Sequence, residues 1–232
     1  MKNGNVYEMN GYRVIDMAKH IDPETETRLC KVDRHGPGHG LVPGFGSTLT
    51  VTTHLGTHIE GPSHQHEGWP GIGELPVTTF IGRGLLVDFK DTVPERGIIS
   101  YADMDRLCLD RVRDGDILIL DSDWKLPPFT ADSNTEKDRR LIVGTDVANW
   151  CVDHNVKAMG FGDGITVECG APGTTWMFHE IMLRHNKPFV EVLQNVEELK
   201  EDHFFFMCAP LPIKGTDSGT TWAVAIEGVE GF

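Results

Sequence analysis

The stretch SYADMDRLCLDRVRDGDILILDSDW, residues 100–124, predicts a helix followed by a buried strand. Ser100 is a typical N-cap residue, because its hydroxyl can accept a hydrogen bond from a free N–H of the first helical turn. The apolar run within residues 116–121 is short and is bounded by charged residues, which is typical of a buried strand. The two elements together form part of a strand–helix–strand unit.

The same alternation of elements continues on both sides of this stretch. Helices are predicted at 145–154 and 173–186, and the second ends near Pro188, which cannot continue a helix. Further strands are predicted at 12–21, 82–90, 156–161, 188–193, 203–215 and 221–228. The polar segment 123–140, which contains two prolines, predicts a long surface loop or lid. The sequence therefore predicts one α/β domain over residues 1–232, with a strand-rich N-terminal third.

The composition limits the classes of partner. A net charge of −14 over 232 residues repels phosphate backbones and anionic lipid headgroups, so neither nucleic acid nor a membrane surface is expected as a partner. No apolar stretch approaches the about 20 residues that a membrane span needs, and the first 17 residues lack the apolar run of a signal peptide. The five cysteines are scattered and contain no CxxC pair, which predicts reduced thiols and a cytoplasmic location.

A second stretch, THLGTHIEGPSHQHEGWPG at residues 53–71, contains four of the eleven histidines of the chain. In an extended strand, alternate side chains share one face, so His54, His58 and Glu60 would lie together. Nitrogen and oxygen donors of this kind suit zinc, manganese or iron. The alternative is a set of surface or hydrogen-bonded core histidines, and the clustering with a glutamate favours the metal site.

Four residues of straight strand span about 13 Å, too far for His54 and His58 to share one ion. Either a bend at Gly56 closes this gap, or His54 serves a second ion. Gly61 and Pro62 end the strand, which predicts that His64 points back into the site.

Two more candidate ligands lie late in the chain. His179 falls in the predicted helix 173–186, and Glu191 falls on the strand after Pro188. In a continuous helix they would be about 18 Å apart, so only a reversal at residues 185–188 would bring them together. His185 is expected to make a contact at the helix end instead.

The sequence HLGTHIEGPSH at 54–64 resembles the HxGTHxDxPxH motif of the metal-dependent cyclase superfamily, which includes bacterial kynurenine formamidase and isatin hydrolase. The similarity extends from VIDMAKHI at 14–21 to APLPIKGTDSG at 209–219. The resemblance implies a swivelling β/β/α fold and a homo-oligomer built from dimers, which means a dimer or a tetramer.

The resemblance also implies roles for individual residues. One or two zinc or manganese ions per chain would be bound by five ligands, namely His54, His58, Glu60, His179 and Glu191. His64 matches the catalytic histidine of the family. Glu60 replaces the usual aspartate, and DSGTTWAVA at 217–225 differs from the DGSPVRAVA of many relatives, which leaves the metal number and the substrate open.

These residues predict a hydrolase that cleaves an amide, a cyclic amide or a lactone of a small molecule. A divalent metal polarises a carbonyl and lowers the pKa of a water molecule, and a histidine such as His64 can take up a proton and return it. A metal-dependent lyase, dehydratase or cyclase and a non-catalytic metal-binding protein are the alternatives. A cysteine nucleophile is disfavoured, because neither Cys151 nor Cys169 lies in a pattern that assigns it a histidine.

Overall fold

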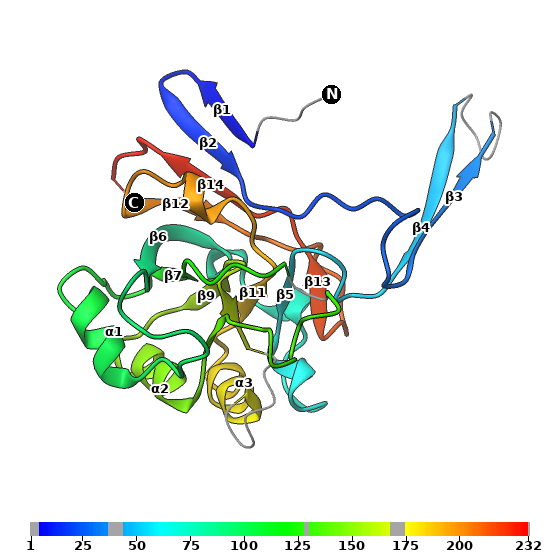
Figure 1. The fold of residues 1–232 in the computed structure, drawn as a ribbon. Helices are drawn as coiled ribbons and strands as arrows, with labels where there is room; N and C mark the ends of the chain where they lie inside the picture. Colours follow the sequence, from blue (N-terminus) through cyan, green and yellow to red (C-terminus); the bar gives the residue numbers. More distant parts are fainter. Residues whose placement is uncertain (1–4, 37–43, 128–129, 168–174, 232) are drawn as a thin grey trace.

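The computed structural model describes residues 5–36, 44–127, 130–167 and 175–231. The centre of its main sheet consists of four parallel strands, β6 (Ile81–Asp88), β7 (Ile117–Asp121), β9 (Ala158–Phe161) and β11 (Phe189–Glu191). The connections between them contain three helices, α1 (Tyr101–Cys108), α2 (Thr145–Asp153) and α3 (Thr175–Arg184), which lie on the same face of the sheet (Figure 1). The predicted alternation of strands and helices is therefore confirmed.

Antiparallel strands extend the sheet on both sides of this parallel centre. On one side lie β12 (His203–Met207), β14 (Val224–Glu227), β2 (Tyr12–Asp16) and β1 (Val6–Met9). On the other side lie β5 (His58–Glu60) and β13 (Ser218–Thr220). The full order is β1-β2-β14-β12-β6-β7-β9-β11-β5-β13, so strands from both ends of the chain belong to one sheet.

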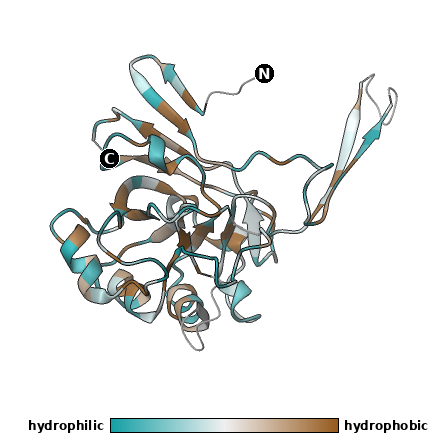
Figure 2. Cartoon of the chain, viewed as in Figure 1, coloured by the Kyte–Doolittle hydropathy of each residue, from teal (hydrophilic) through white to brown (hydrophobic). Residues whose placement is uncertain are grey.

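The two faces of the central strands are buried in separate cores. On the helix side, Phe161, Phe178 and Phe189 form a cluster of ring contacts. On the other side, Ile15 and Phe204 from the outer strands belong to one core with Ile119 of β7. The outer antiparallel strands therefore contribute side chains that cover this face of the centre. The hydropathy colouring shows the apolar residues concentrated on the central strands (Figure 2). Burial on both faces explains why these strands read as continuous apolar runs.

Several local predictions agree with the structure. Helix α1 begins after Ser100, whose hydroxyl accepts a hydrogen bond from the Asp103 N–H at 3.2 Å. The predicted helix 173–186 is found as Thr175–Arg184, with residues 173 and 174 outside the described part of the chain. The described residues of the predicted loop at 123–140 contain neither helix nor strand.

Other predictions need correction. The extended strand assumed across residues 54–60 is reduced to His58–Glu60, because the chain turns at Gly56, which has a φ of +60°. The strand predicted at 12–21 ends at Asp16. Sequence reasoning also missed the hairpin of β3 (Cys30–His35) and β4 (Gly46–Val51), which projects away from the body of the molecule (Figure 1).

None of the helices in the described part of the chain has both the length and the apolar character of a membrane span.

Candidate metal centre

Strand pairing brings three of the predicted ligands together. In the antiparallel pairing of β11 with β5, Glu191 lies opposite His58. His58 and Glu60 are two residues apart on β5, so their side chains leave the sheet on the same face. Phe189, opposite Glu60, belongs to the helix-side core, which places these side chains between the sheet and α3. The His58 Nε2 atom is 3.7 Å from Glu191 Oε2 and 3.7 Å from Glu60 Oε1.

A bend at Gly56 adds His54 to this group. The backbone of Gly56 is left-handed, and a Cβ atom there would lie 2.6 Å from Ile21 Cδ1, so the position favours glycine on two grounds. The bend returns the chain, and His54 Nδ1 lies 2.9 Å from Glu60 Oε1. The ring centroids of His54 and His58 are 5.0 Å apart. The bend that the sequence allowed at Gly56 is therefore present.

Two further histidines approach the other oxygen of Glu60. The chain turns after β5 into the short 3₁₀ helix η1 (Pro62–His64), and His64 Nε2 lies 3.5 Å from Glu60 Oε2, as the Gly61–Pro62 turn predicts. Helix α3 places His179 Nε2 at 3.4 Å from the same oxygen. The chain reversal before Pro188 therefore brings both His179 and Glu191 to one cluster.

His185 remains outside the cluster. Its Nδ1 atom lies 2.7 Å from the carbonyl oxygen of Ile181 at the exposed end of α3, which is the predicted helix-end contact.

Glu60 is thus a buried carboxylate that contacts four imidazoles. Burial alone would raise its pKa, but the nearby imidazoles of His179, His54 and His58 outweigh burial and hold the pKa well below its usual range. Burial lowers the pKa of His54, whereas Glu60 and Asp217 raise it, with a net result of about 9. The centre of the cluster is therefore a negatively charged oxygen pair, as a cation site requires.

Asp217 belongs to the site and was missed by sequence reasoning. Its Oδ2 atom accepts hydrogen bonds from His54 Nε2 at 2.8 Å and His64 Nδ1 at 3.1 Å, and its Oδ1 accepts one from the Thr53 hydroxyl at 3.1 Å. Burial raises the pKa of Asp217, but the bonds from His54 and His64 lower it to about 2. Taken alone, an aspartate before a Ser-Gly pair reads as a turn residue. The only sequence signal for Asp217 as a site residue is that it lies within segment 209–219, which resembles the family.

The donor atoms fit a divalent cation. They form two groups, one of His54, Glu60 and His64 and one of His58, Glu60 and Glu191, and the atoms within each group all lie within 4.8 Å of one another. His58 Nε2 and Glu60 Oε2 are buried, and neither has a hydrogen-bond partner among the described residues. Buried polar atoms without partners are rare in folded proteins, and a bound ion would satisfy both. Mixed nitrogen and oxygen donors suit zinc or manganese.

The geometry gives no support to Cys151 as a nucleophile. Cys151 is fully buried in the helix-side core, and burial raises the pKa of its thiol. A thiol in such surroundings stays protonated and unreactive. Cys169 lies outside the described residues.

Comparison with known proteins identifies the family. The sequence profile described as "Putative cyclase" matches residues 14–168. Kynurenine formamidase of Erythrobacter litoralis (strain HTCC2594) is 26% identical over 185 residues, which cover 77% of this chain and 76% of that protein.

Two solved structures of similar fold are isatin hydrolase A from Labrenzia aggregata and a predicted metal-dependent hydrolase from Bacillus stearothermophilus. The first has a TM-score of 0.72 at 16% identity and covers 93% of both chains. The second has a TM-score of 0.65 at 19% identity and covers 93% of this chain and 98% of the other. The predicted cyclase-like α/β fold is confirmed. Since the family profile spans more than half of the sequence and contains the whole stretch from His54 to His64, the chain belongs to the putative cyclase family.

Proposed function

We propose that this protein is a divalent-metal-dependent hydrolase that cleaves an amide, a cyclic amide or a lactone bond of a small molecule. The observation that carries the proposal is the buried carboxylate of Glu60, with His54 and His58 near one oxygen and His64 and His179 near the other. Two relatives bear the names of hydrolytic enzymes, a kynurenine formamidase and an isatin hydrolase, which supports the reaction class.

The proposal assigns metal binding to the five predicted ligands, His54, His58, Glu60, His179 and Glu191. Because imidazoles lie near both oxygens of Glu60, these residues would hold one or two zinc or manganese ions. A divalent ion bound there would polarise a substrate carbonyl and lower the pKa of a water molecule. Glu60 has one methylene more than the usual aspartate, and its oxygens still lie near all four imidazoles.

His64 is proposed as the group that takes up a proton and returns it to the leaving nitrogen or oxygen. Its side chain is 31% exposed, whereas that of His58 is 1% exposed, so His64 lies on the solvent side of the cluster, where a substrate would enter. Its Nε2 faces the cluster and its Nδ1 is held by Asp217. This is the geometry of an oriented acid–base residue.

The reaction class is tested by elemental analysis of the purified protein, followed by a screen of formamides, isatin-like lactams, cyclic imides and lactones in ¹⁸O-labelled water. We expect about one or two ions per chain and a solvent oxygen in the product. A product without ¹⁸O would indicate a lyase, dehydratase or cyclase instead. Bound metal without turnover of any substrate class would indicate a metal-binding protein.

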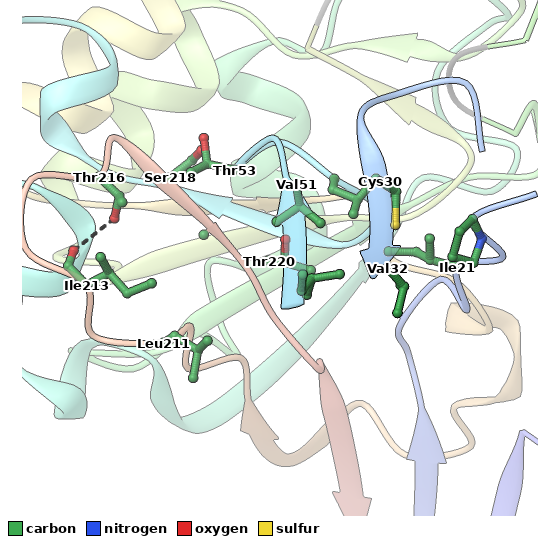
Figure 3. Close-up of a pocket in the computed structure, with 14 residues that line it drawn as sticks. Ile21, Cys30, Val32, Val51, Thr53, Leu211, Ile213, Thr216, Ser218 and Thr220 are labelled. Carbon is green, nitrogen blue, oxygen red and sulfur yellow. Dashed lines mark hydrogen bonds between the residues drawn. The ribbon is translucent and has the colours of Figure 1, made fainter. Parts of the chain in front are cut away.

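We also propose a homo-oligomer, a dimer or a tetramer, because apolar side chains of the projecting hairpin and of the segment before β13 lie exposed beside one another. A pocket of about 330 Å³ lies between the hairpin and the segment before β13, and Val32 and Leu211 line its two sides (Figure 3). Leu49 is 61% exposed and Leu211 is 71% exposed. Contiguous exposed apolar side chains of this kind mark interaction sites, and a second copy of the chain is the proposed partner.

Two remaining expectations stay predictions. The cytoplasmic location is supported by the four described cysteines, none of which forms a disulfide. A single domain over residues 1–232 is supported by a sheet that takes strands from both ends of the chain.

A further inference from the structure

The carboxylate of Asp217 lies between two imidazoles that both point toward Glu60. His54 contacts Asp217 Oδ2 through Nε2 at 2.8 Å and Glu60 Oε1 through Nδ1 at 2.9 Å. His64 contacts the same Oδ2 through Nδ1 at 3.1 Å and lies 3.5 Å from Glu60 Oε2 through Nε2. One oxygen atom therefore touches the outer nitrogen of both rings, and the inner nitrogen of each ring faces the cluster.

The position of Asp217 is itself fixed. Its Oδ1 accepts a hydrogen bond from the Thr53 hydroxyl at 3.1 Å, and its backbone oxygen accepts one from the Gly61 N–H at 2.8 Å. Thr53 and Gly61 lie on either side of the His54–Glu60 segment in the sequence. The carboxylate is thus tied to the same piece of chain whose histidines it orients.

An ionised carboxylate only accepts hydrogen bonds, so an imidazole nitrogen that faces it carries the proton. The other nitrogen of a neutral ring then has a lone pair, which is what a metal ligand or a proton acceptor needs. In His54 both nitrogens face a carboxylate, so the metal-free ring carries both protons, and a bound ion would take the place of the proton on Nδ1. In His58, the acceptor is the Gly56 carbonyl oxygen, which lies 2.9 Å from Nδ1. The proton is therefore held on Nδ1, and Nε2 faces the cluster. Such outer partners fix the tautomer and the orientation of metal-binding histidines.

We propose that Asp217 is a positioning residue that sets the tautomers of His54 and His64 together. His54 then presents Nδ1 to a bound ion, and His64 keeps Nε2 as the proton acceptor. This inference rests on the proposed function for the roles of the two histidines. It adds that one carboxylate, outside the sequence motif, couples metal binding to proton transfer.

The decisive variant is Asp217→Asn. Both rings contact the one atom Oδ2, so the amide presents them either a neutral oxygen, which is a weaker acceptor, or an NH₂ group, which faces both outer nitrogens with a donor; in either case the ionised acceptor that holds their protons is lost. Thr53→Val is a milder variant that retains the carboxylate and removes only the bond to Oδ1. Asp110→Asn is the matched control, because it removes the same charge from an exposed position.

The readouts are zinc affinity, by competition with a chelator, and the tautomers of His54 and His64, from ¹H–¹⁵N correlation spectra of zinc-loaded and metal-free protein at about pH 8. We expect a loss of about 10–100-fold in zinc affinity for Asp217→Asn, a smaller loss for Thr53→Val and no change for the control. The wild type should show Nε2–H for His54 in the zinc-loaded protein and Nδ1–H for His64 in both states. Asp217→Asn should lose at least one of these signals.

Zinc affinity within twofold of wild type, together with unchanged tautomers, would overturn the role of Asp217. Because neither readout needs a substrate, a failed substrate screen leaves this test intact. If the wild type binds no zinc, the proposed function fails, and the tautomer of His64 in the metal-free protein still decides the role of Asp217. Circular dichroism of the metal-free variants separates misfolding from loss of positioning.

Discussion

Glu191 lies directly opposite His58 in the pairing of β11 with β5, with the carboxylate 3.7 Å from the imidazole. Strand β11 also pairs in parallel with β9, so the connection that contains α3 is anchored at both of its ends. This anchoring holds His179 of α3 against Glu60. The candidate centre therefore forms only when the sheet has formed, and a bound ion should in turn stabilise the sheet.

His58→Ala should remove the metal, the activity and the metal-dependent stability together. A ligand that binds only the folded state raises the free energy of unfolding by about 2.7 kcal/mol at a concentration of 100 Kd. Chelator should therefore lower the Tm of the wild type and leave that of His58→Ala unchanged. Elemental analysis and thermal unfolding check this, with His185→Ala as a control at the exposed end of α3. A His58→Ala protein with wild-type metal content would contradict the assignment.

His64→Ala should keep most of the metal and the fold. It should lose about 10²–10⁴ in kcat, which is the usual contribution of a positioned acid or base. Metal content and kcat measured on the same preparation check both parts. If the variant is purified without metal, His64 is a ligand, as its grouping with His54 and Glu60 allows. If it stays fully active, the proton-transferring group lies elsewhere.

Gly56→Ala should lower the free energy of unfolding and weaken metal binding, since the bend carries His54 into the cluster. A left-handed backbone costs about 1–2 kcal/mol for a residue with a Cβ atom, and the contact with Ile21 adds to this. Gly115→Ala is the matched control, because Gly115 also has a positive φ, of +79°, and its added Cβ would meet nothing within 4 Å. Urea unfolding of both variants measures the difference. Equal losses would show that the contact with Ile21 contributes nothing.

Asp163→Asn should raise stability above about pH 6. Burial raises the pKa of Asp163 to about 6, and its Oδ1 has no hydrogen-bond partner among the described residues. The folded state therefore binds a proton that the unfolded state has already lost, and wild-type stability falls as the pH rises from about 4 through 6. Unfolding curves at several pH values should show this slope in the wild type and lose it in the variant.

Asp138→Asn is the control for Asp163→Asn, because it is expected to change stability in the opposite direction. Burial raises the pKa of Asp138, but hydrogen bonds from Arg140 and from the Asn134 N–H outweigh burial and lower it. Its ionised form therefore stabilises the fold at neutral pH, and that contribution is lost as the pH falls below about 4. Asp138→Asn should be less stable than the wild type at pH 7. An Asp163→Asn variant that loses stability in the same way would contradict the assignment.

The wild type should sediment as a dimer or a tetramer at micromolar concentration, and Leu49→Asp should shift it toward the 25.8 kDa chain. A buried charge without a partner is strongly unfavourable at an apolar interface. Leu109→Asp is the control, because Leu109 is an exposed leucine just after α1, away from the hairpin. Analytical ultracentrifugation checks all three proteins. A wild type that sediments as a single chain would contradict the proposed oligomer.

The sequence by itself determined the features that depend on neighbouring residues. The cap at Ser100, the turn after Glu60 and the alternation of strands and helices follow from capping, backbone restrictions and apolar periodicity, all of which act over a few residues. The grouping of His54, His58, Glu60 and His64 was predictable for the same reason, because two turns within eleven residues, at Gly56 and at Gly61–Pro62, bring them together.

Only the tertiary structure decided which distant residues complete the centre. The register that sets Glu191 opposite His58 and the position of Asp217 beside two histidines result from strand pairing and burial of both sheet faces. The sequence allowed a bend at Gly56, and the structure shows it as a left-handed residue that places His54 beside Glu60. The β3–β4 hairpin left no clear signal, because Lys31, Asp33 and Arg34 interrupt β3 and most residues of both strands are exposed, so neither strand shows a buried apolar pattern. Such contacts join residues far apart in the chain, so no local pattern contains them.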